Sequence, residues 1–143
     1  MNPCDTDTLT AALIRLCRAH RSYANSLLGA FGLHAGQERL LLLIADAGGL
    51  NLSQLAASLG VQPPTVTRIV QRMEAGGLLE RRSDPSDARA SLICASAEGL
   101  ALRERIEAVW AQLEARLGEG MTLEERLLLR RLLLQGGDNF TRP

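Results

Sequence analysis

Apolar residues recur at every third or fourth position along the first third of the chain. From Thr8 this spacing predicts one long amphipathic helix that ends at Gly32, since glycine is suited to a helix C-terminus. A second helix is expected from Ala35 to Asp46, where a run of leucine and isoleucine indicates burial on most sides. Gly48-Gly49 stops this helix.

The middle of the chain has shorter elements. Ser53 is a good N-cap for a helix of residues 54–59, and Gly60 supplies the turn that follows it. Pro63-Pro64 opens a fourth helix, because a proline in the first turn removes no helical hydrogen bond. Gly76-Gly77 closes that helix.

Two short strands follow the fourth helix. Leu78–Arg82 and Ser91–Ala95 are expected to pair around the polar loop SDPSDARA. A helix, a tight turn, a second helix and a strand pair form a winged helix-turn-helix, which places a helix in the DNA major groove and an arm in the minor groove. We therefore expect a mainly α fold with a small β-hairpin wing.

Two further helices complete the chain. Ser96 is expected to cap a fifth helix that Gly118 breaks, and Thr122-x-x-Glu125 is a capping box for a sixth helix that runs to about Gln135. Leucine-rich helices at both ends expose more apolar surface than one winged unit covers, which favours a homodimer. The expected organisation is an N-terminal dimerisation helix in residues 1–34, a DNA-binding region in 35–99 and C-terminal dimerisation helices in 100–143.

Composition narrows the class of protein. The 143 residues are 46% apolar but only 3% aromatic, which fits one domain of packed helices. The sequence has no 18-residue apolar run and no leader pattern, so we expect a cytoplasmic protein. Three cysteines without a C-x-x-C pair argue against a disulfide framework and a zinc site. We expect neither a metal nor a cofactor.

The formal net charge is zero, which by itself does not favour a nucleic-acid partner. The distribution of charge matters more than its sum. Between residues 68 and 89, five arginines face four acidic residues, and two of these acids are placed to orient arginines. A basic stripe can therefore still form on one face of the protein.

The fourth helix carries polar side chains away from its apolar face. Arginine and glutamine bind base edges through two hydrogen bonds, and threonine bonds phosphate or contacts a thymine methyl group. A solvated polar face is the alternative, but a preceding helix and turn and a following hairpin favour DNA. With the neighbouring segments, the predicted DNA contacts are Ser53, Gln62, Pro64, Thr65, Thr67, Arg68, Gln71, Arg72, Arg81, Asp84, Ser86, Asp87 and Arg89.

Arg89 lies in the hairpin, close in sequence to Asp84 and Asp87. An arginine at a wing tip suits a narrow minor groove, where the negative potential is enhanced. One of the two aspartates would hold Arg89 or Arg81 in a fixed direction. An ordinary turn is the alternative, since Asp-Pro and Ser-Asp favour turns, and the two interpretations are compatible.

The order of elements and the segment GLLERRSDPSDARASLICASAEG resemble the MarR family of bacterial transcription regulators. The Asp-x-Arg pattern of that family's wing is matched by Asp87-Ala88-Arg89, and its upstream GL-x-x-R by Gly77–Arg81. Its Leu-Thr-x-x-Gly exit from the wing is matched only in part, by Ala95–Gly99. His34 stands where the second helix of the family often has a hydroxyl cap. The resemblance covers about residues 8–135.

The resemblance implies an obligate homodimer, built from the first, fifth and sixth helices, that binds a short inverted repeat in double-stranded DNA. It also implies a small-molecule cleft between the dimer helices and the winged unit. An arginine beside apolar walls would favour an aromatic carboxylate, although such arginines are also typical of an exposed surface. The candidate ligand-binding residues are Arg18, His20, Arg21, Tyr23, His34, Arg39 and Trp110.

A thiol-based redox sensor is an alternative that depends on Cys17. The peroxide-sensing branch of the family carries a reactive cysteine early in its first helix, and that position falls near Thr10 here. Arg15 and Arg18 would favour a reactive thiolate if they face Cys17. Otherwise Cys17 is an inert apolar residue.

An enzyme is not expected, because the sequence has no nucleophile elbow, no H-E-x-x-H, no glycine-rich phosphate loop and no carboxylates at metal-binding spacing. A winged protein-interaction module without DNA binding is a further alternative. The wing arginine and the polar helix face argue against it. The sequence predicts a repressor that binds its operator as a dimer and is released by a signal.

Overall fold

The computed structural model describes residues 8–142, without the side chains of Ala88 and Arg89. Helix α1 spans Leu9–Leu28, and the Oγ1 of Thr8 caps it by accepting from the N–H of Ala11 at 3.1 Å. The short 3-10 helix η1 (Gly29–Phe31) follows and ends at Gly32, whose φ is +70°. The predicted first helix is thus present, with a tighter last turn.

Three helices form the middle of the chain: α2 (Gln37–Ala47), α3 (Leu52–Leu59) and α4 (Pro63–Ala75). The predicted N-cap of α3 is wrong, because Asn51 and not Ser53 begins this helix. The side chains of Asn51 and Gln54 each accept from the other residue's backbone N–H at 2.9 Å, which forms a reciprocal capping box. Ser53 lies inside α3, on its exposed surface.

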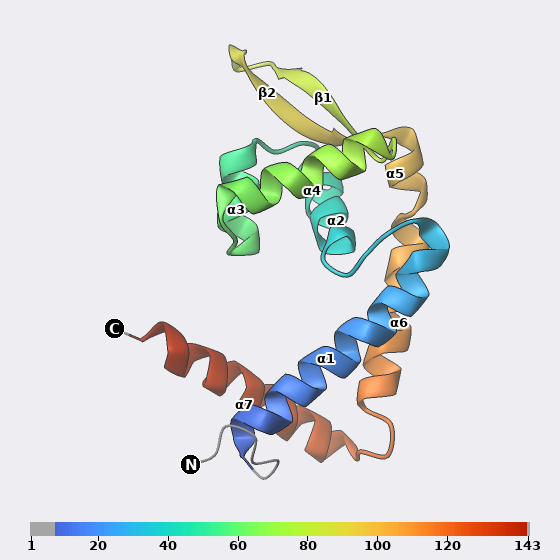
Figure 1. The fold of residues 1–143 in the computed structure, drawn as a ribbon, viewed down its shortest axis with the longest axis vertical. Coiled ribbons are helices and arrows are strands. Elements are labelled where there is room, and N and C mark those ends of the chain that lie inside the picture. The colour runs from blue at the N-terminus through green and yellow to red at the C-terminus, as the bar shows by residue number, and fades with distance from the viewer. Residues whose placement is uncertain (1–7, 143) are drawn as a thin grey trace. The chain divides into compact units, whose positions relative to one another are not determined.

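Strands β1 (Leu79–Asp84) and β2 (Asp87–Ala95) form an antiparallel hairpin, the wing, which projects from the C-terminal end of α4 (Figure 1). The eight-residue loop predicted here is wrong, since only Pro85-Ser86 forms the turn. The carboxylate of Asp84 accepts from the N–H of Ser86 at 2.8 Å and from its Oγ at 2.6 Å. These two bonds close a tight turn and let both strands extend further than predicted.

The chain ends with the helices α5 (Ala97–Ala101), α6 (Arg103–Leu117) and α7 (Leu123–Thr141). The prediction of one continuous fifth helix is wrong. At Leu102 the N–H bonds to the carbonyl of Gly99 at 3.2 Å, and this tighter pattern separates α5 from α6. The predicted capping box of Thr122 and Glu125 begins α7, but the helix runs through Gly136-Gly137, beyond its expected end.

The chain divides into two compact units, Met1–Val109 and Trp110–Pro143. The core of the first unit consists of apolar side chains that are at most 2% exposed and come from α1, the loop before α2, α2, α3, α4, β2 and α6: Ala24, Leu28, Leu33, Leu40, Leu41, Ile44, Leu55, Val66, Val70, Met73, Ile93 and Ile106. In the second unit, no residue of α7 is buried. Within residues 8–142, the helices all fall short of the length and apolarity that crossing a membrane requires.

Candidate nucleic-acid interface

The exposed face of α4 carries two long polar side chains. Val66, Val70 and Met73 point into the core, so the helical repeat leaves Arg68 and Gln71 on the opposite side, and both are exposed. Within the described residues, the guanidinium of Arg68 has no hydrogen bond and no ion pair. Its donors are therefore available to a base edge or a phosphate.

The predicted contacts at the start of α4 differ in how available they are. Gln62, Pro64 and Thr65 are exposed. Thr67 is half-buried, and its Oγ1 donates to the carbonyl of Pro63 at 3.0 Å. Because its proton is used within the helix, Thr67 has only its methyl group and the acceptor lone pairs of its hydroxyl left for DNA.

The turn between α3 and α4 fixes the direction of α4. Gly60 has a φ of +64°, a conformation that suits glycine. The N–H of Val61 returns to the carbonyl of Ala56 at 3.2 Å, and Leu55 on the inner face of α3 is fully buried. α3 and α4 thus form one packed helix-turn-helix, with the polar face of α4 outward.

An ion pair holds Arg81 of the wing. Its Nε lies 2.8 Å from Oε1 of Glu74, in the last turn of α4. The pair that holds Arg81 is thus with Glu74, whereas Asp84 bonds Ser86; that Asp84 or Asp87 orients Arg89 stays a prediction. The sequence contained no signal for this pair, since seven positions separate its members.

The tip of the wing is organised by Asp84. Hydrogen bonds from the hydroxyl and the N–H of Ser86 lower the pKa of the Asp84 carboxyl. The strand register shifts between Ser83 and Asp84, so that Asp84 pairs with Asp87 while Ser83 pairs with Ser91. The side chain of Arg89 lies outside the described residues, and its DNA contact stays a prediction.

A hollow of about 400 Å³ lies between α1, the loop before α2, and α4. Its walls include Arg21 of α1 and Arg68 and Arg72 of α4, but no acidic residue. None of these three guanidiniums pairs with another described residue. The three guanidiniums therefore bring positive charge to the walls of the hollow.

The structure brings together only part of the predicted ligand-binding set. Arg21 and His34 both line the hollow. The remaining predicted positions in the first unit do not line this hollow, and their ligand contacts stay predictions. They are the exposed residues Arg18, His20, Tyr23 and Arg39. Trp110 belongs to the second unit and is 44% exposed.

Sequence reasoning missed two residues that shape the hollow. The Oδ1 of Asn25 accepts from the N–H of Ala35 at 2.7 Å, and the Oε1 of Gln37 accepts from the N–H of His34 at 2.9 Å. Together these bonds hold the loop before α2. Gln37 could have been found as the third residue after a cap position. Asn25 could not, because ten positions separate it from Ala35.

The two described cysteines differ in exposure. Cys17 is exposed on α1, whereas Cys94 is buried in β2 with its Sγ 3.6 Å from the carbonyl oxygen of Gly48. Within residues 8–142, no three histidine, cysteine or acidic side chains are grouped so as to hold a metal ion.

The MarR family model matches residues 33–91, which extend from the loop before α2 into the wing. Over 113 residues, or 76% of each chain, the sequence is 32% identical to the homoprotocatechuate degradative operon repressor of Escherichia coli. The chain belongs to the MarR family. The sequence-based resemblance to this family is confirmed.

Solved MarR structures share the fold of this MarR-family chain. One crystal structure of MarR has a TM-score of 0.77 and 28% identity, and the match covers 96% of this chain and 95% of that one. A mutant MarR from E. coli, complexed with operator DNA, has a TM-score of 0.81 and 25% identity, with 89% and 91% covered. The chain is a DNA-binding transcription regulator with the predicted helical, winged architecture, and not an enzyme.

Proposed function

We propose that this MarR-family protein is a repressor that occupies an inverted-repeat operator as a homodimer and is released by a small anionic ligand. The observation that carries the proposal is the unpaired Arg68 beside Gln71 on the exposed face of α4, next to the projecting wing. Repression requires only that a promoter be occupied. The E. coli relative is itself named an operon repressor.

In this proposal α4 is the recognition helix and enters the major groove. Arg68 and Gln71 then bond base edges, while Thr65 and Arg72 lie on the flank of α4 nearer the hollow. The wing reaches the adjacent minor groove, where Arg89 meets the negative potential of A·T-rich sequence. A two-fold dimer sets two recognition helices about one DNA turn apart, which requires an inverted repeat.

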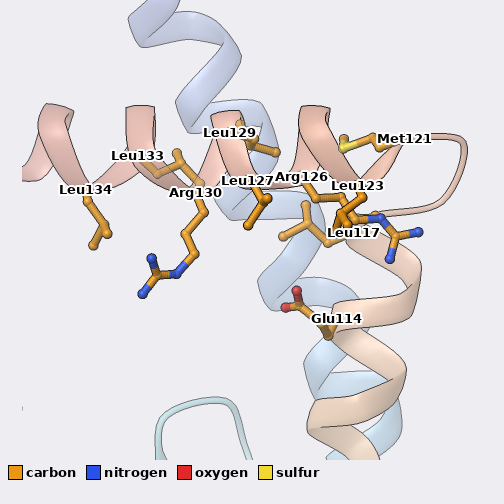
Figure 2. A pocket seen from close by; sticks show the side chains of 11 residues that line it. Glu114, Leu117, Met121, Leu123, Arg126, Leu127, Leu129, Arg130, Leu133 and Leu134 are labelled. Carbon is orange, nitrogen blue, oxygen red and sulfur yellow. The ribbon is translucent and has the colours of Figure 1, made fainter.

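Apolar surface in the second unit supports the dimer. Leu123, Leu127 and Leu133 of α7 are 67%, 59% and 42% exposed in the single chain. They line a hollow of about 630 Å³ with Leu117 at the end of α6. In Figure 2, Leu123 and Leu127 lie near Leu117, and Leu133 lies further along α7. In this proposal a second copy of the chain covers this surface. Residues 1–34 and 100–143 are then the dimerisation segments, and residues 35–99 are the DNA-binding region.

The three arginines of the hollow beside α4 support an anionic ligand. Arg21, Arg68 and Arg72 can bond a carboxylate, and Ile69 and Pro64 offer apolar surface to an aromatic ring. Because Arg68 also lies on the face proposed to read DNA, a ligand that binds it withdraws it from the operator. Release of DNA then follows from competition for one side chain.

Two alternatives make different predictions. A thiol sensor would use Cys17, whose exposure on α1 leaves it accessible to peroxide. A protein-interaction module would show no affinity for any duplex at low salt, where electrostatic attraction to DNA is strongest.

The test is selection of DNA from a random pool by the purified full chain. We expect an enriched inverted repeat whose half-site centres are about 10 base pairs apart, or a multiple of that spacing. An enriched single half-site would contradict the dimer, and no enrichment at low salt would contradict operator binding. The same motif, located in the source genome, identifies the genes that the protein regulates.

A further inference from the structure

The wing has little apolar packing of its own beyond its base. Leu79 is buried, whereas the next four residues of β1, Glu80–Ser83, are all exposed. The base is held by Ser96, whose N–H donates to the carbonyl of Leu78 at 3.1 Å and whose Oγ donates to that of Gly77 at 2.6 Å. It is also held by Ile93 of β2, which is fully buried and exchanges backbone hydrogen bonds of 3.0 and 2.8 Å with Leu50. Beyond this base the wing is a two-stranded hairpin, which by itself is only marginally stable, so a further contact with α4 helps to fix its angle to that helix.

One ion pair crosses from the exposed part of the wing to α4. The Nε of Arg81 lies 2.8 Å from Oε1 of Glu74, and its Nη2 donates to Oε2 at 3.4 Å, so that both carboxylate oxygens are engaged. The pair is partly shielded, because only 23% of the Glu74 side chain is exposed. It spans the Gly76-Gly77 turn, where the chain passes from helix to strand.

The neighbouring arginine of β1 is bound differently. Arg82 pairs with Glu80 of its own strand, with its Nε 2.7 Å from Oε1. That pair does not reach α4. Of the two ion pairs that involve consecutive arginines of β1, only the pair of Glu74 and Arg81 connects the wing with the recognition helix.

We propose that Glu74 and Arg81 are positioning residues for DNA binding: their ion pair fixes the angle of the wing to α4, so that both grooves are contacted together. Arg81 then acts through Glu74 and does not hold a phosphate itself, because its guanidinium is already paired. This changes the role that the sequence suggested for Arg81. The inference rests on the proposed minor-groove placement of the wing.

Because Glu74 is negatively charged, the proposal predicts a change in DNA affinity that is opposite in sign to the change expected from charge alone. Removal of a carboxylate near DNA lowers electrostatic repulsion and by itself strengthens binding. Loss of a positioning pair has the opposite effect, because the wing must be ordered when DNA binds. Glu80 is the matched control, since its replacement removes the same charge from the same region and leaves the connection to α4 intact.

The experiment measures operator affinity at several salt concentrations, with A·T-rich and G·C-rich flanks. We expect Glu74→Ala to bind about three- to tenfold more weakly and to lose flank preference, while Glu80→Ala binds at least as tightly as wild type. Arg81→Ala should match Glu74→Ala with an unchanged salt slope, and the double variant should be no weaker than either. The exchanged pair, Glu74→Arg with Arg81→Glu, should restore affinity.

Three results would overturn the proposal. The first is that Glu74→Ala binds as Glu80→Ala does. The second is that Arg81→Ala alone lowers the salt slope by about one unit, which marks a phosphate contact. The third is that the exchanged pair fails to recover affinity although its thermal unfolding matches that of wild type. If wild type itself shows no preference for A·T-rich flanks, the minor-groove proposal fails together with this one. If wild type has that preference and Glu74→Ala keeps it, only the positioning role is overturned.

Discussion

Gly99 lies where the base of the wing meets α5. Its N–H donates to the Oγ of Ser96 at 3.0 Å, and the same hydroxyl donates to the carbonyl of Gly77. A Cβ at Gly99 would clash with the carbonyl oxygen of Leu78 and would lie 3.1 Å from a methyl group of Leu41. Since the nearest atom belongs to the backbone, the wing's base would have to shift to accept a larger residue.

We therefore expect Gly99→Ala to lower the free energy of unfolding by about 1–3 kcal/mol, as overpacking of a closed site does. Urea denaturation followed by circular dichroism measures the change. Gly29→Ala is the control, because Gly29 has a helical φ of −58° and a Cβ added there would meet open space, with nothing within 4 Å. It should be neutral or slightly stabilising. Equal stabilities of the two variants would contradict the close contact at Gly99.

Replacement of Cys17 distinguishes the proposed ligand signal from the alternative signal, oxidation of a thiol. Cys17 is exposed on α1, but the hollow beside α4 does not include it. We expect peroxide to leave operator binding by wild type unchanged, and Cys17→Ser to bind as wild type does. Release of wild type by peroxide, absent in Cys17→Ser, would replace the ligand proposal with thiol sensing. Gel-shift titrations with and without peroxide give the answer.

The elements show which parts of the fold a sequence can predict. Helix α4 and its two ends are predictable because Pro63-Pro64 and Gly76-Gly77 are strong local signals. The N-cap of α3 is harder to predict although the capping box of Asn51 and Gln54 is visible in the sequence, because Ser53 offers a competing cap. The predicted strands are too short, because the hydrogen bond from the N–H of Ser86 to the Asp84 carboxylate closes a two-residue turn. That bond depends on side-chain geometry, which the sequence pattern does not reveal.

The hollow beside α4 can be predicted only in part. Arg21 and His34 are expected from the resemblance, but the sequence assigns Arg68 and Arg72 to DNA alone. Arg68 and Arg72 also line the hollow beside α1, and this follows from tertiary packing that no local pattern encodes. The same applies to the ion pair of Glu74 with Arg81, which joins two separate elements.

Arg21 tests the proposed ligand site without altering α4. We expect benzoate, but not benzamide, to release wild type from its operator. Arg21→Ala should need about tenfold more benzoate, because a hydrogen bond to a charged group is lost, while its DNA affinity stays unchanged. Arg18→Ala is the matched control, since Arg18 is an exposed arginine of the same helix outside the hollow. Equal benzoate responses of the two variants would exclude Arg21 from the site.

At the scale of the whole molecule, the apolar surface of α7 is the main feature that a single chain leaves unexplained. Leu127, Leu128 and Leu132 are each about half exposed or more, at 59%, 49% and 50%. The leucine periodicity predicts such a surface from the sequence. The partner that covers it cannot be derived from local patterns, because it depends on contacts between separate chains.

We expect Leu127→Glu to shift the protein from dimer to monomer, with a dimer dissociation constant raised at least about tenfold, because a charge would enter an apolar interface. Operator affinity should fall with it, since each monomer reaches only one half-site. Gln135→Glu adds the same charge elsewhere on exposed α7 and should remain dimeric. Sedimentation equilibrium distinguishes the two; a dimeric Leu127→Glu protein would place the interface elsewhere.

One comparison tests most directly whether α4 reads DNA sequence through Arg68. The affinities of wild type and Arg68→Ala are measured on the selected operator and on random duplex at the same salt concentration. We predict a loss of about 1–3 kcal/mol on the operator and a clearly smaller loss on random DNA, because a base contact is lost only where the right base is present. An equal loss on both duplexes would show that Arg68 binds phosphate, and would contradict sequence reading by this side chain.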